Sequence, residues 1–156
     1  MKYVLMVFGL VVISTVVAWG GPEGQEAAIK KTALDYGEGW YEGDAARMER
    51  ALHPDLAKRV LMPDARSGKG RVEHMSAMTL VQYTRSGFGK ETPAEKRKAE
   101  VKVLDIYGNT ASVKLEMHDW IDYMHMVRVR GEWKIVNVLW ELTPEAKKRQ
   151  NIPEEL

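Results

Sequence analysis

Residues 98–142 read KAEVKVLDIYGNTASVKLEMHDWIDYMHMVRVRGEWKIVNVLWEL. Apolar and polar side chains alternate along 98–107 and 110–117, and the Gly108–Asn109 pair between them is typical of a hairpin turn. Two further strands are expected at 123–129 and 133–142, with residues 130–132 interpreted as a three-residue turn between them. The stretch therefore predicts a meander of four consecutive strands.

Helical patterns precede this meander. Apolar residues of the segment 25–41 recur at intervals of four, three and four, which predicts one buried face of a helix. A second, short helix is expected after Asp44 and a third after Ser76, because both residue types cap helix N-termini. Strands at 60–62 and 71–75, joined by a loop rich in turn formers, are expected between the last two helices. The apolar residues of the first helix are Ile29, Ala33, Tyr36 and Trp40.

The order helix, helix, strand pair, helix and four strands predicts an α+β fold, with helices on one side of a mostly antiparallel sheet. A length of 156 residues, 45% of them hydrophobic, fits one domain. The 23 basic and 22 acidic residues form no long run of one sign, which argues against a nucleic-acid partner. The absence of cysteine excludes disulfides, thiolate metal sites, cysteine nucleophiles and a lipoprotein anchor.

The N-terminal segment differs from the rest of the chain. Lys2 precedes an apolar run over 3–19, and the sequence Gly-Gly-Pro ends it, which predicts a signal peptide at residues 1–20. Cleavage after Ala18 and cleavage after Gly20 both fit the small residues there, and an uncleaved membrane anchor is the alternative. We therefore expect an exported protein, periplasmic or secreted, with a domain at 21–143 and an exposed, charged tail at 144–156.

Several short segments resemble a known family. DYMHMV at 122–127 and GEWKIVNVLW at 131–140 are similar to the closing hairpin of the putative lumazine-binding family, within the nuclear transport factor 2-like superfamily. GWYEGD at 39–44 and HPDLAKR at 53–59 also resemble that family, so the likeness covers 25–142. The resemblance implies a cone-shaped, curved sheet with three helices of the N-terminal half on its concave face, around a small-molecule pocket. Related proteins include isomerases, cyclases, dehydratases, binding modules and dimerisation units, so the fold leaves the function open.

The last hairpin suggests which side chains face that pocket. In the expected register, Tyr123 pairs with Leu139 and His125 with Asn137 on one face. We expect this face to point into the cone, where aromatic side chains of the helices stack a flat ligand. A polar pair satisfied within itself, and helical aromatics that are plain core, are the alternatives. The expected ligand-binding residues are Tyr36, Trp40, Tyr83, Tyr123, His125 and Asn137.

The opposite face of the same hairpin carries an apolar stripe. A soluble monomer rarely exposes such a stripe, so we expect it to form a homodimer interface. The alternative is an inverted arrangement, in which the stripe packs under the helices and His125 and Asn137 lie outside. The residues of the stripe are Met124, Met126, Val136, Val138 and Trp140.

Catalytic and metal-binding residues are not assigned from the sequence. Asp119 and Asp122 are candidate pocket carboxyls of an isomerase-type site, but they belong to an expected turn, where aspartate bonds its own backbone. A metal site would need these two and His118 and His125 to converge across that turn. We therefore expect no cofactor and no metal, and a small-molecule-binding protein. An isomerase- or cyclase-type enzyme and a dimerisation or partner-binding module are the alternatives.

Overall fold

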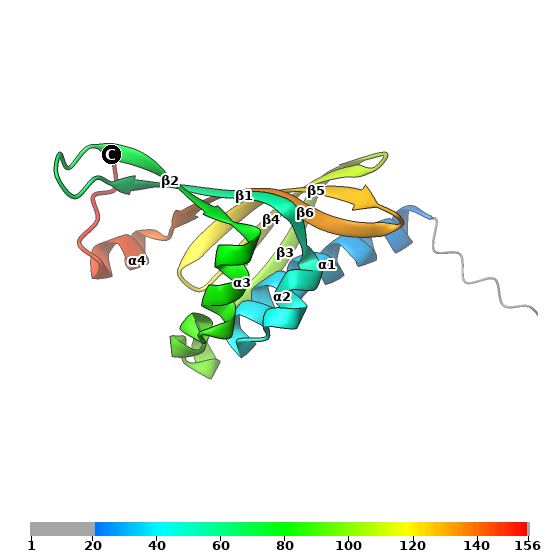
Figure 1. Ribbon diagram of the computed structural model, residues 1–156, viewed down its shortest axis with the longest axis horizontal. Helices are drawn as coiled ribbons and strands as arrows, with labels where there is room; N and C mark the ends of the chain where they lie inside the picture. Colours follow the sequence, from blue (N-terminus) through cyan, green and yellow to red (C-terminus); the bar gives the residue numbers. More distant parts are fainter. Residues whose placement is uncertain (1–20, 156) are drawn as a thin grey trace, which may run out of the picture.

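The computed structural model describes residues 21–155, which form one six-stranded sheet with helices on one face (Figure 1). The helices are α1 (Pro22–Glu42), α2 (Ala45–Ala51), α3 (Ala77–Arg85) and α4 (Pro144–Arg149), with short 3-10 helices η1 (Phe88–Glu91) and η2 (Ala94–Lys96). The strands are β1 (Leu52–Pro63), β2 (Gly70–Ser76), β3 (Ala99–Tyr107), β4 (Thr110–Met117), β5 (Trp120–Val129) and β6 (Glu132–Leu142).

The sheet has the order β2–β1–β6–β5–β4–β3. Every neighbouring pair is antiparallel except β1 and β6, which run parallel. Strands β3 to β6 form the predicted meander, and the hairpin β1–β2 extends its β6 edge (Figure 1). The curved sheet with α1, α2 and α3 on its concave face confirms the predicted α+β cone fold.

The helix ends follow the predicted signals. The Asp44 carboxylate accepts a hydrogen bond from the backbone N–H of Arg47 at 2.9 Å, and the Ser76 hydroxyl accepts one from Thr79 at 3.2 Å. Each cap satisfies a backbone donor that has no partner within its helix. Helix α1 ends at Gly43, whose φ of 66° lies in the left-handed region that favours glycine. Gly43 and the Asp44 cap fix the tight corner between α1 and α2.

The turn between β5 and β6 differs from the prediction. Val129 pairs with Glu132, so the turn has two residues, Arg130 and Gly131, both with positive φ. A two-residue turn alone would place polar and apolar residues on each face, but Val136 forms a bulge that adds one residue to β6. Beyond this bulge the strand returns to the expected pairing. His125 therefore lies opposite Asn137, as predicted, although the turn itself is one residue shorter than predicted.

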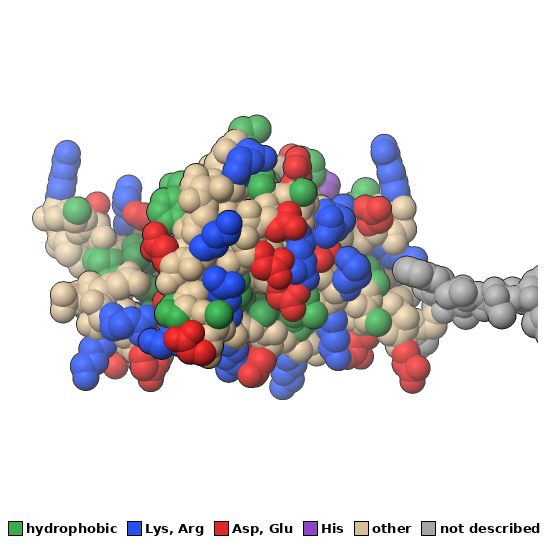
Figure 2. Space-filling model, turned by 90° about the horizontal axis from the view of Figure 1, so that it is seen from below, with side chains coloured by type: hydrophobic (Ala, Val, Ile, Leu, Met, Phe, Trp, Pro, Cys, Tyr) green, Lys and Arg blue, Asp and Glu red, His purple; other side chains and the backbone are tan. Residues whose placement is uncertain are grey.

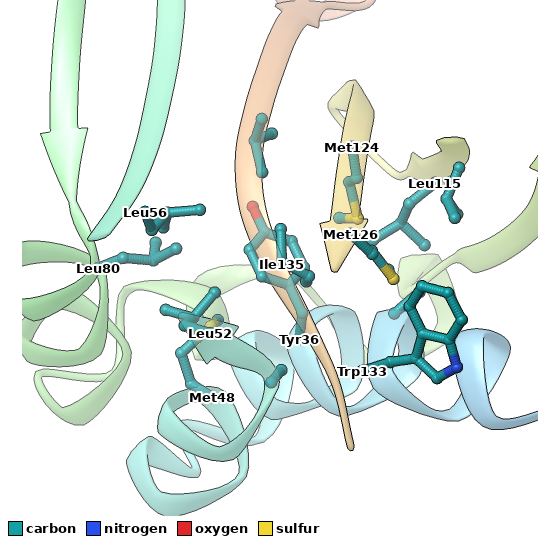
Figure 3. Close-up of a cluster of buried hydrophobic side chains, with 14 of the residues drawn as sticks. Tyr36, Met48, Leu52, Leu56, Leu80, Leu115, Met124, Met126, Trp133 and Ile135 are labelled. Carbon is teal, nitrogen blue, oxygen red and sulfur yellow. The ribbon is translucent and has the colours of Figure 1, made fainter. Parts of the chain in front are cut away.

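The face assignment of this hairpin is inverted. Met124, Met126 and Val138, predicted at a dimer interface, are almost fully buried. Met124 and Met126 lie in the core on the helical side of the sheet (Figure 3). Tyr123 and Leu139, predicted to face the cone, are 52% and 56% exposed on the opposite side of the sheet. Burying a Met or Val side chain stabilises the fold by roughly 1.5–3 kcal/mol, so the apolar row belongs to the core. The predicted dimer interface is wrong for this reason. Its other two residues are Val136, half-buried at the bulge, and Trp140, which packs against the core.

The core lies between α1 to α3 and the concave face of the sheet. Ile29, Ala33 and Tyr36 of α1 are buried in it, which confirms the predicted helical face. Leu52 and Leu56 of β1 meet side chains of α2 and α3 there (Figure 3). Burial of these side chains fixes the helices to the sheet.

Most residues of the C-terminal segment are exposed, and the segment forms the short helix α4. The Thr143 hydroxyl caps α4 through the backbone N–H of Ala146 at 3.3 Å, and Ala146 is fully buried. Lys147 contacts Glu141, and Arg149 contacts Asp119, each at 2.5 Å. The predicted signal peptide lies outside the described residues, and no helix within 21–155 meets the length and hydropathy needed to cross a membrane.

Candidate functional site

A cluster of charged and polar side chains is buried between α1 and the sheet. Lys58 of β1 is 5% exposed, and its Nζ lies 2.5 Å from Oδ1 of Asp122, a fully buried residue of β5. The same Nζ donates to the Tyr36 hydroxyl of α1 at 2.6 Å. Tyr36 in turn lies 3.4 Å from Asp122 Oδ1. Three elements far apart in the sequence thus meet at one charge pair.

The strand period explains how these charges reach the interior. Successive side chains of a strand point to opposite faces, so Lys58 shares its face with Leu56 and Val60, both buried. In β5, Asp122 shares its face with Met124. One ionisable residue therefore interrupts each of two apolar rows. Between them runs β6, and the side chains of Lys58 and Asp122 meet above it.

The buried environment shifts the pKa values of Lys58 and Tyr36, the two side chains that contact Asp122. Burial lowers the pKa of the Lys58 ammonium, and the opposing effect of the Asp122 carboxylate does not fully compensate. Burial, followed by the negative charge of Asp122, raises the pKa of the Tyr36 hydroxyl well above its usual value. The phenol therefore stays protonated at neutral pH and acts as a hydrogen-bond donor. Perturbed groups of this kind are frequent at functional sites and also occur in structural ion pairs.

Three tryptophans surround the cluster. The indole N–H of Trp120 donates to Asp122 Oδ2 at 2.8 Å. The ring of Trp120 meets Trp40 at 6.0 Å and Trp140 at 6.1 Å, both edge to face. Lys58 Nζ lies 4.8 Å from the centre of the Trp140 ring, within cation–π range. All three tryptophans are partly exposed, whereas Lys58 and Asp122 beside them are buried. We call Lys58, Asp122, Tyr36 and these three tryptophans the tryptophan-lined centre.

Trp40 is held in place through its backbone. Gly89 of η1 packs so closely on it that a Cβ at position 89 would lie 2.0 Å from the Trp40 carbonyl oxygen. Only glycine allows this approach. The close contact fixes the end of α1, and with it the Trp40 ring, against the segment that follows α3.

The structure brings together only two of the six predicted ligand-binding residues. Tyr36 and Trp40 belong to the tryptophan-lined centre. Tyr83 is exposed on α3 and packs against Phe88 at 5.2 Å. The remaining three, Tyr123, His125 and Asn137, lie on the outer face of the sheet.

The His125–Asn137 pair has partners of its own on that outer face. The amide nitrogen of Asn137 lies 3.3 Å from His125 Nδ1, and Arg59 donates to the Asn137 oxygen at 2.9 Å. The polar pair is thus satisfied locally, which was the alternative considered from the sequence.

Sequence reasoning missed Lys58, Trp120 and Trp140. The alternation of Leu56, Lys58 and Val60 carried a signal for Lys58, because it places the lysine on the apolar side of a strand. Of the two candidate carboxyls, Asp122 enters the interior. Asp119 stays near the surface, where Arg149 pairs with it. Residues 21–155 contain no group of three His, Asp or Glu side chains placed to hold a metal ion.

The charge pair and the tryptophans suit recognition of a flat, polar molecule. Lys58 and Tyr36 supply hydrogen-bond donors, and the Asp122 carboxylate supplies an acceptor. Indole rings offer faces and edges for stacking. All buried side-chain polar atoms of the described residues have partners, so a ligand would exchange hydrogen bonds with the cluster rather than fill unmet ones.

Comparison with known proteins places the chain in a family. The model of the family described as "Putative lumazine-binding" matches residues 24–141. No curated protein matches the chain.

Solved structures share the fold. A nuclear transport factor 2-like protein of unknown function from Shewanella baltica superimposes with a TM-score of 0.63 at 19% identity, covering 80% of this chain and 98% of that one. One from Methylobacillus flagellatus gives 0.59 at 20% identity, covering 80% and 96%. One from Silicibacter pomeroyi gives 0.60 at 13% identity, covering 79% and 99%. The chain belongs to the family described as "Putative lumazine-binding".

Proposed function

We propose that this chain is an exported protein that binds a flat small molecule at its tryptophan-lined centre. The family supports small-molecule binding in general. The observation that carries the proposal is the ion pair of Lys58 and Asp122, buried beneath the helices and bordered by three partly exposed tryptophans.

Stability alone gives little reason for this ion pair. Removing two charges from water costs several kcal/mol for each ion, and the attraction between them offsets this cost only partly. Replacing such a pair by apolar residues of similar volume is often neutral or stabilising. The chain nevertheless places Lys58 and Asp122 in rows that are otherwise apolar. A role in recognising a ligand accounts for that placement.

The surroundings indicate the class of ligand. A planar ring stacks on indole, and a carbonyl or ring nitrogen accepts a hydrogen bond from Lys58 or Tyr36. The Asp122 carboxylate accepts from a ligand N–H once the Trp120 indole moves away from it. A neutral heterocycle with both donors and acceptors meets these conditions.

Export rests on the N-terminal sequence. The apolar run over 3–19, preceded by Lys2 and followed by Gly20–Gly21–Pro22, has the features of a signal peptide. The bound molecule is therefore one that is available outside the cytoplasm.

Acid–base catalysis is the second candidate, and the position of Asp122 favours it. Its carboxylate lies in the interior beside a neutral tyrosine, which provides a base and a hydrogen-bond donor in one place. The substitution Asp122→Asn distinguishes catalysis from binding alone. This change abolishes turnover in an enzyme, whereas a binding protein shows no turnover before or after it.

The experiment is mass spectrometry of the small molecules that co-purify with the protein from its native compartment. We expect one compound to accompany the wild type and the Tyr83→Leu variant, and to be lost from Trp120→Leu. Tyr83→Leu is the matched control, because it removes an aromatic ring on the outside of α3. Circular dichroism verifies that both variants fold. Loss of the compound from Tyr83→Leu with retention in Trp120→Leu would contradict the proposed site.

A further inference from the structure

A concave site lies at the end of α1 away from the tryptophan-lined centre. It is an open groove of about 580 Å³ between the N-terminal half of α1, the end of α2 and the β5–β6 hairpin. None of its lining residues belongs to the tryptophan-lined centre. Its volume is within the range of small-molecule sites, about 300–1,000 Å³.

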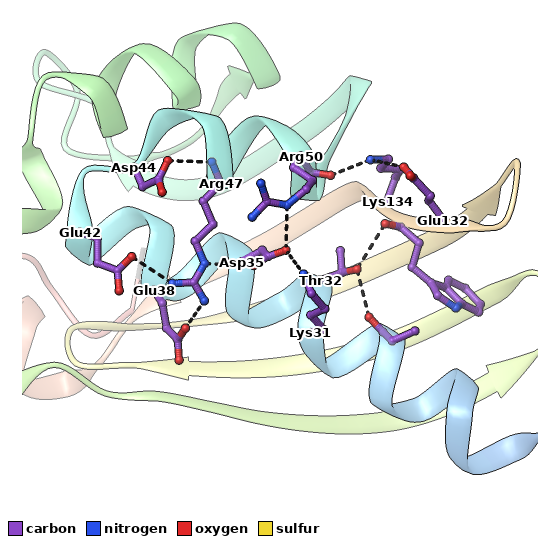
Figure 4. A network of polar contacts seen from close by, with 12 residues as sticks. Lys31, Thr32, Asp35, Glu38, Glu42, Asp44, Arg47, Arg50, Glu132 and Lys134 are labelled. Carbon is purple, nitrogen blue, oxygen red and sulfur yellow. Dashed lines mark hydrogen bonds and ion pairs between the residues drawn. The ribbon is translucent and has the colours of Figure 1, made fainter. Parts of the chain in front are cut away.

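The groove has an apolar part supplied by α1 and β6. Ala27 and Ala28 line it from the helix, and Trp133 lines it from the strand. The Thr32 hydroxyl lies 3.1 Å from the Ala28 carbonyl and 3.3 Å from the Trp133 carbonyl (Figure 4). This contact ties α1 to the hairpin and occupies the hydroxyl. The groove is therefore formed before any ligand arrives, and its apolar part is available for an apolar body.

The lining is positively charged overall. Its basic residues are Lys31, Arg50, Arg128 and Lys134, against the acidic Asp35 and Glu132.

The carboxylate of Asp35 is shared among several cations (Figure 4). Lys31 approaches it at 2.7 Å, Arg47 at 3.0 Å and Arg50 at 3.3 Å. Arg47, which does not line the groove, also pairs with Glu38 and Glu42, so the three cations of this network face three carboxylates and the network itself carries no excess charge. Elsewhere on the helical side basic and acidic side chains are interspersed (Figure 2).

Arg128 is the cation with the most capacity for a new partner. Lys134 pairs with Glu132 at 2.9 Å and also donates to the Arg50 carbonyl at 2.7 Å. Arg128, in contrast, pairs with no carboxylate of residues 21–155, and its Nε donates only a long bond of 3.4 Å to the Gly131 carbonyl. A guanidinium fork matches the geometry of a carboxylate, which it binds through two parallel hydrogen bonds.

We propose that this groove binds a small amphipathic carboxylate, with the apolar body against Ala27, Ala28 and Trp133 and the carboxylate on Arg128. The site is independent of the tryptophan-lined centre and goes beyond the function proposed for it. It needs no movement of the core, because its walls are already joined through Thr32.

The test is isothermal titration calorimetry of the protein expressed from the full-length chain, with decanoate and the neutral decanol as probes. Wild type binds decanoate more tightly than decanol. Arg128→Gln lowers decanoate affinity by about 10-fold or more, the effect of losing a charge-assisted hydrogen bond, and leaves decanol affinity unchanged. Arg130→Gln is the matched control, because it removes the same charge from the hairpin turn outside the groove and leaves both affinities unchanged.

A second variant tests the apolar part. Ala27 is exposed on α1 and lines the groove, so Ala27→Trp fills the space without disturbing the core. This variant is expected to bind both decanoate and decanol more weakly than wild type. The proposal is overturned if wild type binds no decanoate, or if Arg128→Gln behaves like Arg130→Gln. It is also overturned if Trp120→Leu abolishes decanoate binding while Ala27→Trp does not, because the probe then occupies the tryptophan-lined centre.

Discussion

Lys58 Nζ lies 2.5 Å from Asp122 Oδ1, although 64 positions separate the two residues in the sequence and β6 separates their strands in the sheet. Neither charge is accessible to bulk water. Each is tolerated in the interior only because the other is present, so the two side chains behave as one unit. The tryptophans and Tyr36 are arranged around that unit.

Removing one member of the pair is expected to be costly. Lys58→Met leaves the Asp122 carboxylate buried without its cation, and we expect the free energy of unfolding to fall by about 3–5 kcal/mol. Urea denaturation measures the change. Lys102→Met is the matched control, since Lys102 is exposed on β3 and its replacement changes stability by less than about 0.5 kcal/mol. Equal effects of the two substitutions would show that Lys58 is not buried with Asp122.

Substitution of Trp40 distinguishes a role in ligand binding from a role in core packing. Its ring is partly exposed and meets Trp120 edge to face at 6.0 Å. Trp40→Ala is expected to remove the co-purifying compound, while the free energy of unfolding falls by less than the roughly 3–5 kcal/mol typical of a fully buried tryptophan. Mass spectrometry and parallel denaturant melts measure the two effects. A stability loss within that range, with the compound retained, would make Trp40 plain core.

The carboxyl group of Asp35 is expected to make the stability of the folded protein depend on pH. Burial acts to raise the pKa of its carboxyl, but hydrogen bonds from Lys31, Arg47 and Arg50 outweigh burial and lower it from 3.8 to about 2. Because the folded pKa is the lower one, the contribution is fully present above about pH 4 and is lost as the pH falls toward 2. The difference corresponds to about 2 kcal/mol.

Asp35→Asn tests this window. We expect the variant to be less stable than wild type by about 2 kcal/mol at pH 7, with the difference disappearing near pH 2. Asp55→Asn is the control, because the Asp55 side chain is 88% exposed and lies 3.7 Å from His53 as its only ionisable partner within residues 21–155. A difference that persists unchanged to pH 2 would assign the effect of Asp35 to packing rather than charge.

The order of elements was predictable because each one carries local signals. Asp44 and Ser76 mark helix starts, and the helical spacing of Ile29, Ala33 and Tyr36 marks the buried face of α1. These signals act over a few residues. They do not depend on what packs against the element, and so they can be found without the structure.

The faces of the last hairpin and the buried charges were not predictable in the same way. A bulge at Val136 reverses the relation between the turn and the strand faces, and no glycine or proline in β6 marks it. Lys58 looks like a surface residue, since lysine is almost never fully buried unless it is paired. Its partner Asp122 lies 64 positions away. Only the folded sheet brings the two together.

Export is tested on the natural protein. Intact-mass analysis is expected to show a chain that begins near Trp19 or Gly21, after removal of the apolar run over 3–19. Recovery of the whole chain from the membrane fraction would instead establish an anchor.

The most direct test of the tryptophan-lined centre replaces both charges at once. In Lys58→Met with Asp122→Leu, apolar side chains fill the same interior, so we expect the double variant to fold with a free energy of unfolding close to that of wild type. It is expected to lose the small molecule that accompanies wild type. Mass spectrometry of the two proteins, purified side by side from the native compartment, measures this. A double variant that is folded and still carries the compound would contradict ligand binding at Lys58 and Asp122.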